Sequence, residues 1–184
     1  MLGSGTALRA CSQILLRPTV PTPVTFFRQN RQLKSTSMAS ASVLQDDIPN
    51  NDQPLNVLGT ALGRHSVSPM TGFFRDGYCR SDPSDLGEHT VAGVVSDLFL
   101  DYSASQGNDL STPHPPMFPG LTSGCRWCLC ASRWKEALLA YRAGNISRDA
   151  VPKVVLNATD SSVLRRVSLS DLREFAFDDS RGER

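Results

Sequence analysis

The stretch Gly124–Ala137, GCRWCLCASRWKEA, contains three of the five cysteines and both tryptophans of the 184-residue chain. Within it, residues 126–131 are predicted to form a strand. Ser132 is then placed to cap a helix that continues until Gly144, since serine is a favoured N-cap residue and glycine commonly follows a helix C-terminus. The stretch therefore predicts a strand that passes almost directly into a helix.

Outward from this stretch, further strands and helices follow one another without a regular βαβ spacing. Residues 90–95 and 153–156 are rich in β-branched residues and predict strands, whereas Ser96 and Ser168 are placed as helix N-caps. Residues 107–124 contain four prolines, which exclude a helix or a central strand. We therefore expect an α+β fold: a small two-layer domain with a mixed or antiparallel sheet and short helices.

The composition divides the chain into four parts. Residues 1–45 lack acidic side chains and are rich in serine, threonine and arginine, and residues 46–54 are polar with two prolines. We predict a disordered transit peptide over 1–45, a linker over 46–54, a single α+β domain over 55–177 and a flexible tail over 178–184.

The composition of residues 1–45 is typical of a mitochondrial or plastid transit peptide. Its longest apolar run, Ile14–Leu16, is too short for a secretory signal, and no segment of the chain has the apolar length of a bilayer span. We expect the mitochondrial matrix as the location, with the plastid as the alternative. Translation from Met38 would give a cytosolic form.

The charge distribution argues against a nucleic-acid-binding protein. Five of the 19 Lys and Arg residues precede Asp46, the first acidic residue, so 14 cations face 18 acidic residues in the remainder. A mildly acidic body lacks the basic face that phosphate binding requires. The partner expected is a small molecule or a protein.

Three cysteines form a C-x-x-C-x-C pattern in the central stretch. Because side chains alternate along a strand, Cys128 and Cys130 should share one face while Cys125 points to the other. A reducing matrix argues against disulfides, so packed apolar groups, metal ligands and reactive thiols remain as readings of the pair. Cys79 and one of the histidines His65, His89 or His114 are the available partners for a metal.

Two further groups of residues are candidates for function. Cys128 or Cys130 could act as a catalytic thiol with His89 as its base. The polar residues of the 107–124 loop, with Arg126 on the strand, could bind a ligand; the candidates are Asn108, Asp109, Ser111, Thr112 and Arg126. The alternative for the loop is that Asn108 and Asp109 form an Asx turn and that the hydroxyls satisfy backbone groups.

Eight segments occur together in an order that resembles a known family. These segments are NVLG, PMTGFFRDG, DLGEHTV, GNDLSTP, FPGL, RWCLCASRWKEA, VVLNAT and VSLSDL. Their order is similar to that of the bacterial domain-of-unknown-function family 2237, over residues 55–176. The resemblance implies a small α+β two-layer domain and no assigned activity.

Departures from the family's pattern concern the cysteines. The resemblance implies that Cys125 is peculiar to this chain, and that His65 stands where the family tends to have a cysteine. Because zinc accepts either residue, Cys79, Cys128, Cys130 and His65 would form a Cys₃His zinc site. Loss of other family cysteines favours simple packing instead.

Two functions follow as hypotheses. The first is a small matrix domain that binds a small molecule or partner at the Gly107–Gly124 loop and the RWCLC strand. The alternative is a thiol- or zinc-dependent enzyme that uses Cys128 and Cys130.

Overall fold

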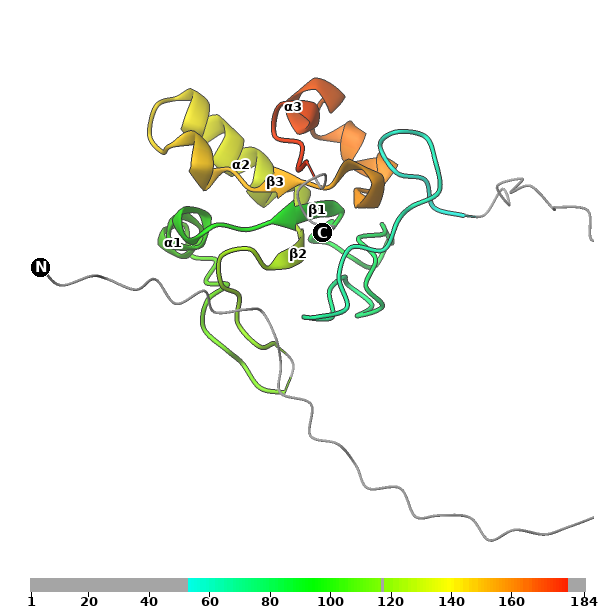
Figure 1. Ribbon diagram of the computed structural model, residues 1–184, viewed down its shortest axis with the longest axis horizontal. Helices are drawn as coiled ribbons and strands as arrows, with labels where there is room; N and C mark the ends of the chain where they lie inside the picture. Colours follow the sequence, from blue (N-terminus) through cyan, green and yellow to red (C-terminus); the bar gives the residue numbers. More distant parts are fainter. Residues whose placement is uncertain (1–52, 117, 179–184) are drawn as a thin grey trace, which may run out of the picture.

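A computed structural model describes residues 53–116 and 118–178 (Figure 1). Three strands and three α-helices alternate along this part of the chain, together with short 3₁₀ turns. In chain order the strands and α-helices are β1 Val91–Val94, α1 Asp97–Ser105, β2 Arg126–Leu129, α2 Ala131–Arg142, β3 Lys153–Val154 and α3 Leu169–Glu174.

The three strands form one antiparallel sheet in the order β2-β1-β3. Gly93 lies at its centre, opposite Trp127 on one side and Val154 on the other. The expected α+β class is confirmed, with an antiparallel sheet. Strand β2 lies at one edge of this sheet, so its outward N–H groups need partners elsewhere in the chain.

The sheet separates a larger and a smaller apolar cluster. The larger cluster contains side chains from all three helices, and Figure 1 shows α2 and α3 on the same side of the sheet. Trp134 of α2 is fully buried there, and its indole Nε1 donates a hydrogen bond to the carbonyl of Pro152 at 3.0 Å. The smaller cluster comprises Cys79, Ala92, Cys128, Val155 and Ala158.

The alternation predicted for β2 is confirmed. Cys125, Trp127 and Leu129 belong to the larger cluster, whereas Cys128 belongs to the smaller one. Cys125 therefore lies on the opposite side of the sheet from Cys128, as the period of two requires.

Two predicted helix caps are confirmed and one is wrong. Ser96 accepts a hydrogen bond from the Phe99 N–H at the start of α1, and Ser168 accepts one from the Asp171 N–H at the start of α3. Helix α2, however, begins at Ala131, and its N-cap is Cys130, not Ser132. Strand β2 ends at Leu129, so Cys130 lies between the two elements.

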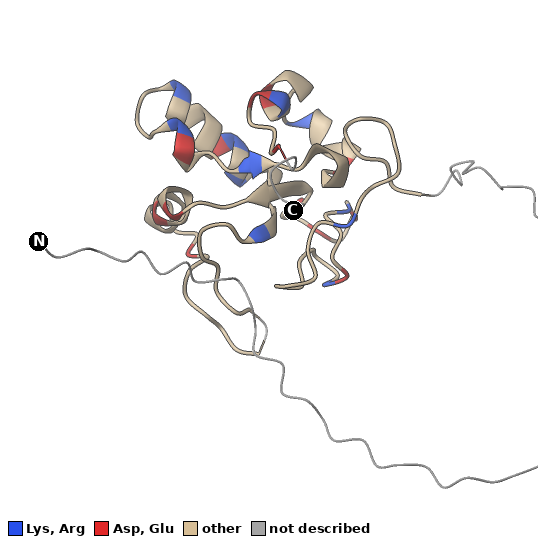
Figure 2. Ribbon diagram, viewed as in Figure 1, with Lys and Arg blue, Asp and Glu red and all other residues tan. Residues whose placement is uncertain are grey.

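Several charged residues belong to α2 and α3 (Figure 2). Arg142 of α2 contacts Glu174 of α3 at 3.2 Å, and Arg148 contacts the same carboxylate at 2.9 Å. All three side chains are well exposed, so water and salt screen these ion pairs and they add little to stability. These ion pairs link α2 and the 3₁₀ turn at Arg148–Ala150 to α3.

The loop of residues 107–124 carries no helix or strand along its described length, as its prolines predict. In Figure 1 it extends away from the sheet, on the side opposite α2 and α3. The predicted transit peptide and most of the predicted linker lie outside the described residues. None of the helices within 53–116 and 118–178 is long and apolar enough to cross a bilayer.

Candidate thiol site

Cys79 and Cys128 are joined in a disulfide across 49 residues of sequence. Both are buried in the smaller apolar cluster, at 0% and 2% exposure. The expectation that the cysteines form no disulfide is therefore wrong. It rested on the redox state of the predicted compartment, whereas the fold brings two buried sulfurs within bonding distance on one face of the sheet.

The backbone around Cys128 is fixed by the segment that precedes Cys79. Its N–H points outward from edge strand β2 and donates a hydrogen bond to Thr71 Oγ1 at 2.7 Å. Thr71 is fully buried, so this bond satisfies an edge N–H that water does not reach. The segment around residue 71 thus covers the outer edge of β2.

Cys130 differs from Cys128 in being a partly exposed free thiol. It is the N-cap of α2, a helix of 12 residues. Helix N-termini carry a partial positive charge, and reactive cysteines recur at such positions and beside histidine.

His89 connects Cys130 to a buried carboxylate. Its pKa is raised to about 9, chiefly by a hydrogen bond with the Cys130 side chain; burial opposes the shift and Asp85 adds to it. His89 Nδ1 lies 2.7 Å from Asp85 Oδ1. Because Nδ1 is engaged by Asp85, Nε2 is the nitrogen left for the thiol.

Asp85 is held so that it can orient His89. It is 3% exposed, and its oxygens accept hydrogen bonds from the N–H groups of Gly87 and His89 at 3.1 and 2.7 Å, besides the imidazole contact. A Cβ at Gly87 would lie 2.5 Å from His89 Cε1, so only glycine leaves room for the ring. The turn DLGEH is therefore shaped around the histidine.

The same turn is tied to the start of α2. Glu88 has a φ of 47°, a strained value for a residue with a side chain, and its carbonyl accepts the Ala131 N–H at 3.0 Å. Its carboxylate pairs with Arg166. These contacts hold His89 next to the thiol at the helix N-terminus.

Cys130, His89 and Asp85 supply, in that order, a nucleophile, a base and a carboxylate that orients the base. A thiol paired with an imidazole that is fixed by a carboxylate is the arrangement used for covalent catalysis by cysteine. Cys130 and His89 were predicted from the sequence, and Asp85 was missed. The available signal was the spacing D-x-x-x-H with an intervening glycine, Asp85 to His89, in a loop that precedes a strand.

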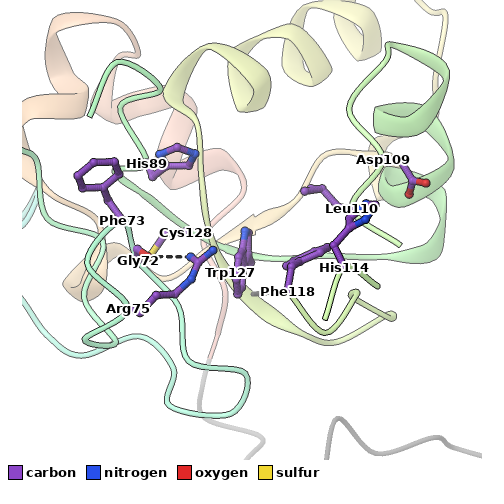
Figure 3. Close-up of a pocket in the computed structure, with 10 residues that line it drawn as sticks. All are labelled: Gly72, Phe73, Arg75, His89, Asp109, Leu110, His114, Phe118, Trp127 and Cys128. Carbon is purple, nitrogen blue, oxygen red and sulfur yellow. Dashed lines mark hydrogen bonds between the residues drawn. The ribbon is translucent and has the colours of Figure 1, made fainter. Parts of the chain in front are cut away.

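A cavity of ≈ 470 Å³ lies beside His89 (Figure 3). Its lining includes His89 and Cys128, whereas Cys130 and Asp85 are not among the lining residues. His89 and Phe73 lie on one side of it, and Arg75 and Trp127 lie in the middle. The other side is formed by loop residues Asp109, Leu110, His114 and Phe118. His89 stacks on Phe73, with the ring centroids 6.5 Å apart. His89 thus belongs both to the cavity lining and to the cluster that contains Cys130.

The predicted ligand-binding residues do not gather in one site, and of them only Asp109 lines the cavity. Asp109 lines the cavity, but its carboxylate accepts hydrogen bonds from the N–H groups of Ser111 and Thr112, at 2.8 and 3.1 Å. The Asn108 amide bonds to Ser103 Oγ, and the Arg126 guanidinium lies over the Phe177 ring. For Asp109 the structure therefore agrees with the alternative prediction, in which its side chain forms an Asx turn within the loop. The cavity uses Leu110, His114 and Phe118 of the loop, which the sequence did not single out as ligand contacts.

The predicted zinc ligands are likewise not gathered together. Cys79 and Cys128 are bonded to each other, and His65 Nε2 lies 3.0 Å from the Gly93 carbonyl. Among the residues that the structure describes, no group of three or more histidine, cysteine or acidic side chains is arranged to hold a metal ion. The zinc site stays a prediction from sequence.

Comparison with family models identifies the family of the described domain. The profile of a family described as "Uncharacterized protein conserved in bacteria (DUF2237)" matches residues 55–176. None of the curated proteins compared with the chain matches it.

Proposed function

We take as premise that the chain belongs to the family DUF2237, uncharacterized proteins conserved in bacteria, and we propose that it is a cysteine-dependent enzyme acting on a small molecule. Cys130 is the nucleophile, His89 is its proton partner and Asp85 orients His89. The single observation that carries this proposal is His89: its Nδ1 lies 2.7 Å from a buried carboxylate, and the largest cause of its raised pKa is the Cys130 thiol at a helix N-terminus.

The chemistry proposed is acyl transfer to water. The sulfur of Cys130 forms a bond to the acyl carbon of the substrate, the bond to the leaving group breaks, and the leaving group takes the proton held by His89. His89 then accepts a proton from a water molecule that attacks the thioester. This attack releases the acid and returns the thiol.

The high pKa of His89 supports the first step. At neutral pH a histidine whose pKa is about 9 is protonated, so it is a cation beside the sulfur. A protonated imidazole stabilises a thiolate and also supplies the proton that the leaving group needs.

The test is the rate at which iodoacetamide alkylates Cys130 in the folded full-length chain, resolved by peptide mass. At pH 7 we expect His89→Gln to slow alkylation by roughly 10- to 100-fold, because the thiolate is the reactive form and a cysteine without an adjacent imidazolium is only a few per cent thiolate. Asp85→Asn should slow it less, since the imidazole remains. Equal rates for wild type and His89→Gln would refute the proposal.

Asp82→Asn is the matched control. Asp82 lies in the same loop as Asp85, but its carboxylate bonds only within the loop, to the Ser84 N–H at 2.8 Å and the Ser84 hydroxyl at 2.5 Å. Its replacement should leave the alkylation rate of Cys130 unchanged. A fall equal to that of Asp85→Asn would show that general loop disturbance, not the orientation of His89, controls the thiol.

A second function, binding without chemistry, is favoured by the cavity itself. The long loop and the RWCLC strand together line it, through Leu110, Phe118 and Trp127. In that case the protein would be a small domain that binds a small molecule or partner in the predicted matrix compartment. An unreactive Cys130 together with saturable ligand binding at the cavity would favour this function over catalysis.

A further inference from the structure

The cavity beside His89 has an unusual cation in its lining. Arg75 contributes its guanidinium, and no carboxylate of the described residues forms an ion pair with it. The neighbouring Arg80, by contrast, is paired with Asp76 at 2.9 Å. The two arginines lie on one turn, yet only Arg80 has an acidic partner within it.

The guanidinium of Arg75 is held in a defined plane. Its central carbon lies 4.8 Å from the centroid of the Trp127 ring, and Nη1 donates a hydrogen bond to the Gly72 carbonyl at 2.8 Å. Figure 3 shows this bond and the side chain lying between Gly72 and Trp127. A guanidinium has five N–H donors in a rigid fork, so a single bond to Gly72 leaves donors for a ligand.

The acid in the cavity lining does not neutralise Arg75. Asp109 is turned into its own loop, where its carboxylate accepts the Thr112 hydroxyl at 2.6 Å besides two backbone N–H groups. These bonds, the Thr112 hydroxyl first, lower the pKa of Asp109, so it is ionised but already fully hydrogen-bonded. His89, the other cation, faces the buried Asp85. Arg75 is therefore the uncompensated charge in the lining.

Apart from Arg75, Asp109, His89 and His114, the lining is mostly apolar. Phe73, Leu110, Phe118 and Trp127 surround the cavity, and Phe118 packs edge-on against Trp127 with the centroids 5.3 Å apart. Small-molecule sites typically combine apolar walls with a small number of placed polar groups that fix the orientation of the ligand.

We propose that the substrate is a small molecule with an apolar body and an oxyanionic group, a carboxylate or a phosphate, which binds Arg75 in the cavity beside His89. This inference rests on the proposed function, because it names the substrate class for Cys130. Arg75 is a specificity residue: it binds the anion and so presents the remainder of the molecule to the thiol.

The experiment compares two alkylating agents that differ in charge. Iodoacetate is anionic and iodoacetamide is neutral, so the ratio of their rates at Cys130, normalised to the same ratio for a free cysteine derivative, measures attraction of an anion. We expect Arg75→Gln to lower this ratio roughly three- to tenfold, because a cleft lined by several like charges raises the encounter rate of opposite charges by about tenfold or more and a single cation is removed here. Dividing by the iodoacetamide rate of the same variant removes any change in thiol reactivity.

Two further variants separate charge from structure. Arg75→Lys keeps the charge while losing the bond to Gly72 and the planar fork, so most of the ratio should remain. Arg133→Gln is the matched control, because Arg133 lies near Cys130 in sequence but pairs with Glu136 at 3.0 Å. Its ratio should equal that of wild type. If Arg75→Lys lowers the iodoacetate-to-iodoacetamide ratio as much as Arg75→Gln does, the inference is overturned. The role of Arg75 would then be to stabilise its own turn through the bond to Gly72.

Competition distinguishes the two oxyanions. Inorganic phosphate or butyrate, compared with chloride at equal ionic strength, should slow alkylation by iodoacetate in wild type and not in Arg75→Gln, and the more effective ion identifies the group. If neither ion slows the reaction and Arg75→Gln keeps the wild-type ratio, the inference is overturned. That result would leave the proposed function intact. The proposed function fails on a different outcome, namely equal rates of Cys130 alkylation by iodoacetamide in wild type and His89→Gln.

Discussion

Cys128 and Cys130 are two residues apart, yet they belong to regions of opposite character. Cys128 is in the buried disulfide with Cys79, on the sheet, whereas Cys130 is a partly exposed thiol at the start of α2. We refer to residues 79 and 128 as the disulfide pair and to residues 85, 89 and 130 as the thiol cluster. These neighbouring cysteines therefore acquire their chemistry from distant segments. Cys128 is bonded to Cys79, whereas Cys130 lies beside His89, which Asp85 orients.

The largest expected effect removes the disulfide pair. Cys79→Ser with Cys128→Ser should lower the free energy of unfolding by about 4 kcal/mol, because the bond closes a loop of 49 residues. Cys130→Ser should change it by less than about 1 kcal/mol, since no covalent bond is lost. Guanidinium unfolding of the full chain measures both values. Equal losses for the two variants would contradict the division into a structural pair and a reactive cluster.

The next effect concerns the thiol cluster and pH. Because the pKa of His89 is raised to about 9, the ring should stay protonated through neutral pH and lose its proton only near pH 9. In Cys130→Ser the midpoint should fall toward the ordinary value of 6.5, because the largest cause of the shift is gone. NMR titration of the imidazole protons measures the midpoint of His89. The chain has only three histidines, so their signals can be assigned separately.

Asp85→Asn gives a second test of the raised pKa of His89. Asp85 contributes to the raised pKa of His89 after the hydrogen bond with Cys130, so its removal should lower the midpoint by less than Cys130→Ser does. A wild-type midpoint near 6.5, insensitive to both substitutions, would show that the thiol cluster is not electrostatically coupled.

The smallest effect lies at the edge of β2, between the two regions. Thr71→Val removes the acceptor of the buried Cys128 N–H and should lower the free energy of unfolding by about 1–2 kcal/mol. Since Thr71 does not contact the thiol cluster, the alkylation rate of Cys130 should be unchanged. Thermal unfolding and the alkylation assay test the two expectations on one variant. A slower Cys130 would show that the edge contact also shapes the thiol cluster.

Much of the fold could be predicted from local patterns. The change from a strand at 90–95 to a helix capped by Ser96 is confirmed, as is the cap of α3 at Ser168. Boundaries were less predictable: β3 has two residues, where four were expected, because the chain turns into a 3₁₀ segment at Leu156–Ala158. The start of α2 was missed by two residues, since Cys130 caps it without a side-chain hydrogen bond.

The candidate site was predictable only in part. Cys130 and His89 stand out as residue types with reactive side chains, but Asp85 resembles any acidic loop residue until its oxygens are seen to accept three hydrogen bonds. Arg75 similarly looks like a surface cation in a turn. Its stacking on Trp127 and its lack of an acidic partner among the described residues appear only when both segments are in place.

By itself the sequence determined the α+β class, the alternation that turns Cys125 away from Cys128, the capping serines and the family over residues 55–176. These features depend on backbone period and short-range hydrogen bonds, which a few neighbouring residues specify. Tertiary structure alone decided that Cys128 pairs with Cys79 and that Cys130 meets His89. Both depend on loops far away in sequence being fixed by buried contacts, Thr71 to Cys128 and Glu88 to Ala131.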